Sequence, residues 1–367
     1  MSLQNNRTGS MSSISKTSGT RSRSNSAPTD DADDPFAGLS FSVGVAENKN
    51  ITYRSKMEDV HTYVANFAEK LDWGYFAIFD GHAGKQTARW CGNNLHTILE
   101  QEILHGELSS TASPVEASPV DPEDTDVDIN GSPAPHKHPV LSDMQENLYQ
   151  AFLRADTLNE KEGNGSSGST AAVAVLRWEA DPSRHPPPEN PEPPQSSPEK
   201  KNHPYDFVPT HHKRVLYTSN VGDSRIVLCR SGHPYRLSYD HKATDPNEIE
   251  RIKNARGLVM KNRVNGVLAV SRSLGDSYMK DLVIGVPFTT ATEITDKDEF
   301  MILACDGVWD VISDAAACKT VSQVLQESNN NAQLAASRLC QQAIDNSTTD
   351  NVTVMVVRFH GGVFNAC

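Results

Sequence analysis

Carboxylates stand at the ends of stretches that have the composition of buried strands. Asp80 follows the apolar run 75–79, Asp306 ends a similar run, and each is followed directly by glycine. Asp350 mirrors the pattern, because it stands just before the β-branched run 352–359. One aspartate after a strand is often a turn former or a helix cap. Its repetition predicts that strand ends sharing a core bring these carboxylates together.

Two further acids, Glu58 and Asp59, lie within or beside another strand-like segment. Five clustered carboxylates repel and raise each other's pKa, so such a cluster needs cations to stay ionised. Ligation by oxygen alone, without Cys or His pairs, favours Mg²⁺ or Mn²⁺ over structural zinc. Alternatively, Arg54, Arg225 or Lys56 pairs with the acids, and for any single aspartate this structural interpretation stays open.

Composition limits the class of protein. The chain has 367 residues and a formal net charge of −13, which argues against non-specific binding to nucleic acid or to anionic membranes. Its six cysteines form no C-x-x-C pair and are typical of reduced, buried thiols. No apolar run has the length of a membrane span, and no signal-peptide core is evident. We expect a monomer in the cytoplasm and nucleus.

Three segments offer almost nothing to bury. Residues 1–40 are predicted to be a disordered tail, and two segments rich in proline and polar residues, 106–141 and 179–212, are predicted to be disordered insertions. The remainder suits one large domain over 41–362. Loop-closure entropy grows slowly with length, so 179–212 can join two neighbouring strands.

Strand patterns alternate irregularly with a few long helices. Helical periodicity is found over 84–104 and again from Ser142, which can cap its helix, and two more helices are expected near 315–326 and 333–345. The strands lack the regular βαβ alternation of a doubly wound fold. The predicted class is therefore α+β, with helices packed outside sheets.

Seven short motifs resemble, in order, the signature motifs of the type 2C protein phosphatases, the metal-dependent serine/threonine phosphatases of the PPM family. The motifs are Arg54-x-x-Met57-Glu58-Asp59, Asp80-Gly81-His82, Gly168-Ser169-Thr170-Ala171, Gly222-Asp223-Ser224-Arg225, Ser271-Arg272-Ser273-Leu274-Gly275-Asp276, Cys305-Asp306-Gly307-Val308-Trp309-Asp310 and Asp350-Asn351-Val352. The resemblance covers about 41–359, and the stretch 282–310 is most similar to fungal members.

The resemblance implies a sandwich of two mainly antiparallel β-sheets flanked by helices, with two Mg²⁺ or Mn²⁺ ions at one end. It implies that Asp80 bridges the two ions, that Asp306 and Asp350 complete one site, and that Glu58 and the carbonyl of Gly81 complete the other. Water between the ions would attack phosphorus in line, so no protein nucleophile is required.

By the same resemblance, Asp59 orients water near the ions, Arg54 grips the substrate phosphate, and His82 protonates the leaving serine or threonine oxygen. A weaker third metal site is implied at Asp223, Asp306 and Asp310. Asp276 is interpreted as structural, because its motif is suited to holding the segment that approaches the catalytic face.

The resemblance leaves function open at two points. Phosphorylated proteins are the implied substrates, and fungal relatives suggest negative regulation of stress-activated MAP kinase pathways. One rival is a catalytically weak pseudophosphatase that acts as an interaction scaffold, which loss of Asp80, Asp306 or Asp350 would favour; all three are present. The other rival, a cation-binding β-sandwich without catalysis, would not need Arg54 and His82.

Overall fold

The computed structural model describes residue 36 and residues 38–111, 142–164, 166–181, 183 and 211–361. Most of the predicted tail (1–40) and of the predicted insertions (106–141 and 179–212) lies outside these described residues. The chain divides into Met1–Ala37 and a second unit, Gly38–Cys367. The architecture is that of the second unit.

Two five-stranded antiparallel sheets form the centre of this unit. The first has the strand order β1-β15-β14-β8-β9 and the second has the order β13-β7-β6-β3-β2. The strands of the first are β1 (Phe41–Asn48), β8 (Arg225–Arg230), β9 (His233–Arg236), β14 (Asp298–Ala304) and β15 (Val352–Phe359); those of the second are β2 (Val60–Ala65), β3 (Gly74–Phe79), β6 (Ala171–Ala180), β7 (His212–Val221) and β13 (Phe288–Ile294).

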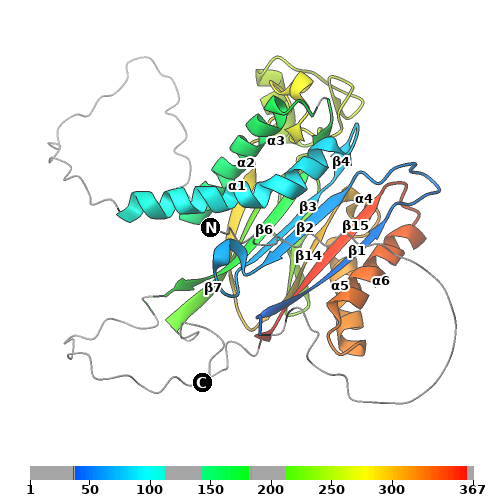
Figure 1. The fold of residues 1–367 in the computed structure, drawn as a ribbon. Coiled ribbons are helices and arrows are strands. Elements are labelled where there is room, and N and C mark those ends of the chain that lie inside the picture. The colour runs from blue at the N-terminus through cyan, green and yellow to red at the C-terminus, as the bar shows by residue number, and fades with distance from the viewer. Residues whose placement is uncertain are drawn as a thin grey trace, which may run out of the picture. The chain divides into compact units, whose positions relative to one another are not determined.

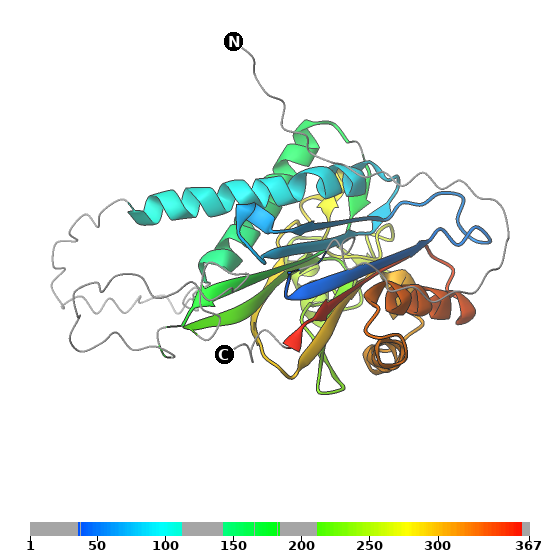
Figure 2. The same cartoon turned by 60° about the horizontal axis from the view of Figure 1, so that its bottom comes forward.

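Long helices cover the outer face of each sheet. The helices α1 (Gln86–Thr111) and α2 (Asp143–Lys161) run along the second sheet, whereas α5 (Asp314–Glu327) and α6 (Ala332–Asp345) run along the first, as both views show (Figures 1 and 2). The α+β class, with two mainly antiparallel sheets flanked by helices, is confirmed. Among the described residues, no helix is long and apolar enough to cross a bilayer.

Central strands of each sheet, such as β3 and β15, are buried on both sides, and side-chain alternation assigns their residues to different layers. In β3 the side chains of Tyr75, Ala77 and Phe79 pack into the core beneath α1 and α2. Phe76 lies between them on the opposite face and meets Phe41 of the other sheet edge to face, with 5.2 Å between ring centroids. The near-continuous apolar runs in the sequence follow from this double burial.

Smaller elements lie outside the two main sheets. A three-stranded sheet has the order β12-β5-β4, and β10 and β11 form a hairpin beside α3. These elements are β4 (Gly81–His82), β5 (Gly168–Ser169), α3 (Pro246–Asn254), β10 (Val259–Met260), β11 (Arg263–Val264), β12 (Leu274–Gly275) and α4 (Asp306–Trp309).

Two predicted boundaries are wrong. The first insertion was expected to begin at 106, but α1 continues to Thr111. Fading apolar periodicity suggested the earlier end, whereas the first residue that cannot continue a helix is Pro114. The second insertion was expected to span 179–212, but β6 and β7 pair as far as Ala180 opposite His212, so both of its ends belong to strands.

Candidate active site

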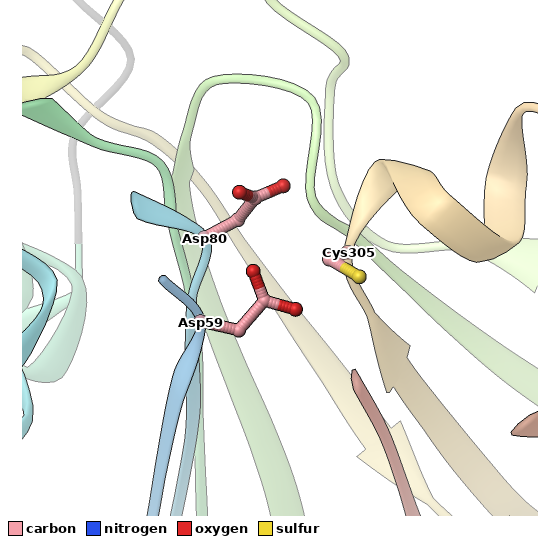
Figure 3. Close-up of side chains that lie close together, drawn as sticks. All are labelled: Asp59, Asp80 and Cys305. Carbon is pink, nitrogen blue, oxygen red and sulfur yellow. The ribbon is translucent and has the colours of Figure 1, made fainter. Parts of the chain in front are cut away.

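Four strands of the two sheets end at one place and bring acidic side chains together. Phe79, the last residue of β3, pairs with Val60, the first of β2, so Asp80 and Asp59 lie next to each other at the end of the second sheet. Figure 3 shows both side chains at these strand ends, with Cys305 across from them. Ligand atoms of the three residues lie within 4.8 Å of one another.

The first sheet supplies the other acids. Ala304, the end of β14, pairs with Val354 of β15, so Asp306 and Asp350 both lie at the same end of this sheet. The chain turns at Asp306 directly into the short helix α4. Register thus gathers acids at the end of each sheet, and because Asp80, Asp306 and Asp350 line one cavity, the prediction that these strand ends meet is supported.

The glycine after each aspartate has a packing role. A Cβ on Gly81 would lie 2.6 Å from the carbonyl oxygen of Glu58, and one on Gly307 would lie 2.0 Å from that of Asn351. Only glycine permits such close approach of two backbones. The repeated Asp-Gly pair thus allows the chain beside each aspartate to pack against the segment that carries another acid.

The acids open into a cavity of about 310 Å³. Eight predicted site residues line it: Arg54, Glu58, Asp80, Gly81, His82, Asp223, Asp306 and Asp350. Asp59 and Asp310 do not line it. Asp59 is 6% exposed, and its Oδ2 accepts a hydrogen bond from Thr353 Oγ1 at 2.7 Å. It therefore lies behind the residues that line the cavity.

The ionised forms of Asp80 and Asp306 in the cavity, and of Asp59 behind it, are electrostatically unfavourable. Burial raises the pKa of Asp80 well above its ordinary value, and the nearby charges of Asp59 and Asp306 raise it further. The pKa of Asp306 is raised in the same way, by burial and by Asp223. Burial is also the main cause that raises the pKa of Asp59 to about 6.

These residues fit hard divalent cations. Neither Asp80 nor Asp306 forms an ion pair with Lys or Arg among the described residues, and buried Oδ1 of Asp306 has no hydrogen-bond partner. Cys305 does not fit this role, because burial raises the pKa of its thiol well above the usual value and hard ions prefer oxygen. The donors that remain are carboxylates and carbonyls.

Two predicted catalytic side chains are held by other acids. Arg54 forms an ion pair with Asp350, and its Nε donates to the carbonyl of Thr349 at 3.1 Å. In this conformation, therefore, Arg54 pairs with an acid of the cluster, which was the alternative interpretation. The Nε2 of His82 lies 2.6 Å from Oδ2 of Asp276.

Comparison with known proteins decides the family. The family model for protein phosphatase 2C matches residues 43–180 and 207–352. Protein phosphatase 2C homolog 1 of Saccharomyces cerevisiae is 47% identical over 319 residues, covering 87% of this chain and 94% of the yeast protein. Protein phosphatase 2C homolog 1 of Schizosaccharomyces pombe is 36% identical over 324 residues, covering 88% and 74%.

This chain belongs to the protein phosphatase 2C family. It is a metal-dependent serine/threonine protein phosphatase, most similar to fungal members, as the motifs indicated. A crystal structure of a phosphatase from Toxoplasma gondii, 23% identical, covers 88% of this chain and 94% of that one with a TM-score of 0.61, which supports the fold.

In this phosphatase, Asp223 and Asp310, the acids implied for a third metal site, lie beside the side-chain ammonium of Lys242. The Nζ of Lys242 lies 2.8 Å from Asp310 and 3.7 Å from Asp223. Burial raises the pKa of Asp223 to about 6, although the charge of Lys242 opposes the shift. Arg225, which was considered as a partner for the clustered carboxylates, pairs with Asp240 and Asp314 outside the cluster. Lys242 takes that place.

The sequence motifs did not reveal every residue that shapes the site. Asn351 organises the loop before β2: its Oδ1 accepts from the backbone N–H of Glu58 at 2.9 Å, and its Nδ2 donates to the carbonyls of Lys49 and Lys56. The only sequence signal for this role was that Asn351 directly follows Asp350 in one motif. Arg263 also lines the cavity, from β11, and no pattern in the surrounding sequence distinguished it.

Proposed function

We propose that this phosphatase hydrolyses phosphoserine and phosphothreonine in proteins by direct attack of water, with two Mg²⁺ or Mn²⁺ ions held at the strand ends. The observation that carries the proposal is the pair Asp80 and Asp306, which face each other's charge without a Lys or Arg partner among the described residues. Asp80 would hold both ions. Asp306 and Asp350 would complete one site.

The other site would be completed by Glu58 and the carbonyl of Gly81, which the missing Cβ brings close to the Glu58 backbone. When bound, the cations lower the pKa of water so that it can attack phosphorus, and they neutralise charge on the phosphoryl oxygens. Asp59, buried behind Asp80, would orient water through hydrogen bonds.

Arg54 and His82 would act on the phosphate and the leaving group. The side chain of Arg54 is 44% exposed, so its planar guanidinium can exchange Asp350 for two oxygens of a phosphate once cations neutralise that carboxylate. His82 lines the cavity and would donate a proton to the departing serine or threonine oxygen, an alkoxide that is otherwise a poor leaving group.

A third, weaker cation would bind between Asp223, Asp306 and Asp310 after displacing the ammonium of Lys242. We further propose, from the resemblance of the motifs to fungal members of the family, that the substrates are phosphorylated proteins of stress-activated MAP kinase pathways, which the enzyme would down-regulate as a monomer in the cytoplasm and nucleus. Phosphoproteome changes on expressing Asp80→Asn, which should retain substrate without turnover, would test this substrate class.

Hydrolysis of a phosphothreonine peptide tests the proposed chemistry. We expect activity that requires Mn²⁺, persists with okadaic-acid-type inhibitors and disappears in Asp80→Asn. Activity that survives chelation would overturn the metal mechanism. Tight phosphopeptide binding without turnover in the Mn²⁺-loaded wild type would instead favour the scaffold.

A further inference from the structure

The small sheet joins three of the sequence motifs. Its middle strand, β5, lies between β4 and β12. His82 in β4 pairs with Gly168 in β5, and Gly168 pairs with Gly275 in β12. The residue after Gly275 is Asp276. The sheet therefore brings the histidine of one motif and the last aspartate of another to the two sides of a single glycine.

The side chains of His82 and Asp276 meet at this point. The carboxylate of Asp276 is completely buried, whereas the imidazole is 27% exposed and lines the catalytic cavity. Oδ2 of Asp276 lies 2.6 Å from Nε2 of His82 and accepts a second hydrogen bond from Ser273 Oγ at 2.5 Å.

This geometry selects one form of the imidazole. An ionised carboxylate only accepts hydrogen bonds, so the hydrogen between the two groups belongs to Nε2 of His82. The nitrogen left to serve the cavity is Nδ1, which has no hydrogen-bond partner among the described residues.

The surroundings are built to permit the contact. A Cβ on Gly168 would lie 2.0 Å from Oδ2 of Asp276 and 2.3 Å from Nε2 of His82, so a side chain there would displace the pair. Asp276 has a φ of 50°, a left-handed conformation that non-glycine residues seldom adopt. It is fixed by its own N–H, which donates to the carbonyl of Ser167 at 3.1 Å, and by Asp156, which accepts from the N–H of Gly275 at 2.9 Å.

We propose that Asp276 is a positioning residue that holds His82 as the Nε2–H tautomer and directs Nδ1 at the leaving oxygen. As the bond between phosphorus and the attacking water oxygen forms, the bond to the serine or threonine oxygen breaks and its electron pair stays on that oxygen. Before this step a proton from solvent has bound to Nδ1 and made His82 an imidazolium, and this proton passes to the oxygen. His82 remains as neutral imidazole, with Nε2–H still donating to Asp276. Orientation and tautomer selection are what the aspartate supplies in Ser-His-Asp triads.

The inference rests on the proposed acid role of His82, and leaving-group dependence tests it. In Mn²⁺, Asp276→Asn should lower kcat/KM for a phosphothreonine peptide by roughly 10–100-fold. For p-nitrophenyl phosphate, whose leaving group needs no proton, the loss should stay below about threefold. His82→Gln should show the same selectivity. The double variant should be no slower than His82→Gln alone, because Asp276 acts only through the imidazole.

Asp298→Asn is the matched control. Asp298 is also a buried aspartate, but it pairs with Arg230 at the start of β14, outside the cavity. Its loss should lower stability without changing the ratio of activities on the two substrates. Equal losses on both substrates in Asp276→Asn, or a further loss in the double variant, would show that Asp276 has a merely structural role.

A spectroscopic measurement separates this inference from the proposed function. In ¹H–¹⁵N imidazole spectra of the Mg²⁺-loaded full chain, the signal absent from His82→Gln should report the Nε2–H tautomer in the wild type and a mixture of tautomers in Asp276→Asn. An Nδ1–H tautomer, or a signal unchanged by Asp276→Asn, would overturn the inference. A wild type inactive on both substrates would overturn the proposed function while leaving this readout intact.

Discussion

Two regions of the molecule bury carboxylates in opposite ways. Glu248 in α3 is 2% exposed, and its oxygens accept hydrogen bonds from Arg251 and Arg272. Burial alone would raise its pKa, but these arginines lower it to about 2. In the cavity, burial and neighbouring acids both raise the pKa of Asp80. A buried acid that the chain neutralises itself is structural, whereas one left facing other acids marks a site for cations from solution.

Substitution of Asp80 should separate function from stability most strongly. Asp80→Asn removes the acid on which both cations depend, so activity should fall by at least about 10³-fold. Because the change also relieves repulsion, the midpoint of thermal unfolding in a chelator should stay level or rise. Initial rates and melting curves of the same preparation measure both. Residual activity within tenfold of the wild type would contradict the distinction between the cation-binding acids of the cavity and the structural acid Glu248.

The converse is expected at Glu248. Glu248→Gln leaves Arg251 and Arg272 buried without their anion, which should lower the free energy of unfolding by about 3–5 kcal/mol. Urea denaturation in a chelator measures this loss. Mn²⁺ binding by the folded fraction should persist. A destabilisation below about 1 kcal/mol would remove the distinction between the two regions.

The cluster should also give stability an unusual pH dependence. The folded-state pKa of Asp59 is raised from 3.8 to about 6, so the folded state holds its proton more tightly than the unfolded state. Its contribution to stability is therefore fully present below pH 4 and is lost as pH rises through 6. The size is on the order of 3 kcal/mol.

Comparison with Asp59→Asn isolates this effect from other titrations. In a chelator, the stability of the wild type relative to Asp59→Asn should fall between pH 4 and 7, as followed by urea denaturation at each pH. Saturating Mg²⁺ should reduce that fall, because cations hold the neighbouring acids ionised. If the difference in the free energy of unfolding between the two proteins is constant with pH, the pKa of Asp59 is not raised by folding.

The smallest effect is expected at Lys242, whose ammonium lies beside Asp223 and Asp310. Its ion pair with Asp310 is largely exposed, so Lys242→Met should cost about 1 kcal/mol or less at pH 7. Millimolar Mg²⁺ should restore the loss by replacing the ammonium, as differential scanning fluorimetry can show. A loss that Mg²⁺ leaves unchanged would mean that Lys242 and a cation do not share this position.

Much of this arrangement could be predicted from sequence, because local patterns determined it. Apolar runs ending in Asp80 and Asp306 identified the strands and their polar ends, and the repeated pattern showed that those ends meet. Helix α2 begins after Ser142, as the pattern predicted, and Gln145 Oε1 accepts hydrogen bonds there from the backbone N–H of Ser142 at 3.3 Å and from its Oγ at 3.1 Å. These features depend on residues close in sequence.

The remainder depends on contacts between distant segments. The glycines after Asp80 and Asp306 are visible in the sequence, but the reason for them is the approach of Glu58 and Asn351 from elsewhere in the chain. Asp276 was interpreted as structural from its motif alone, and that motif gives no sign of the contact with His82, which lies 194 residues away. The pairing of Arg54 with Asp350 likewise joins the two ends of the domain. No periodicity within one element records such contacts.

Binding of Mn²⁺, followed through the electron paramagnetic resonance signal of the free ion, tests the central claim most directly. The wild type and Glu248→Gln should each take up two Mn²⁺ per chain with similar affinity. Asp80→Asn should bind Mn²⁺ at least tenfold more weakly, since second-sphere losses alone reach that size. Equal uptake by Asp80→Asn and the wild type would contradict the account, because the half-buried, unpaired Asp80 would then not be part of the metal centre.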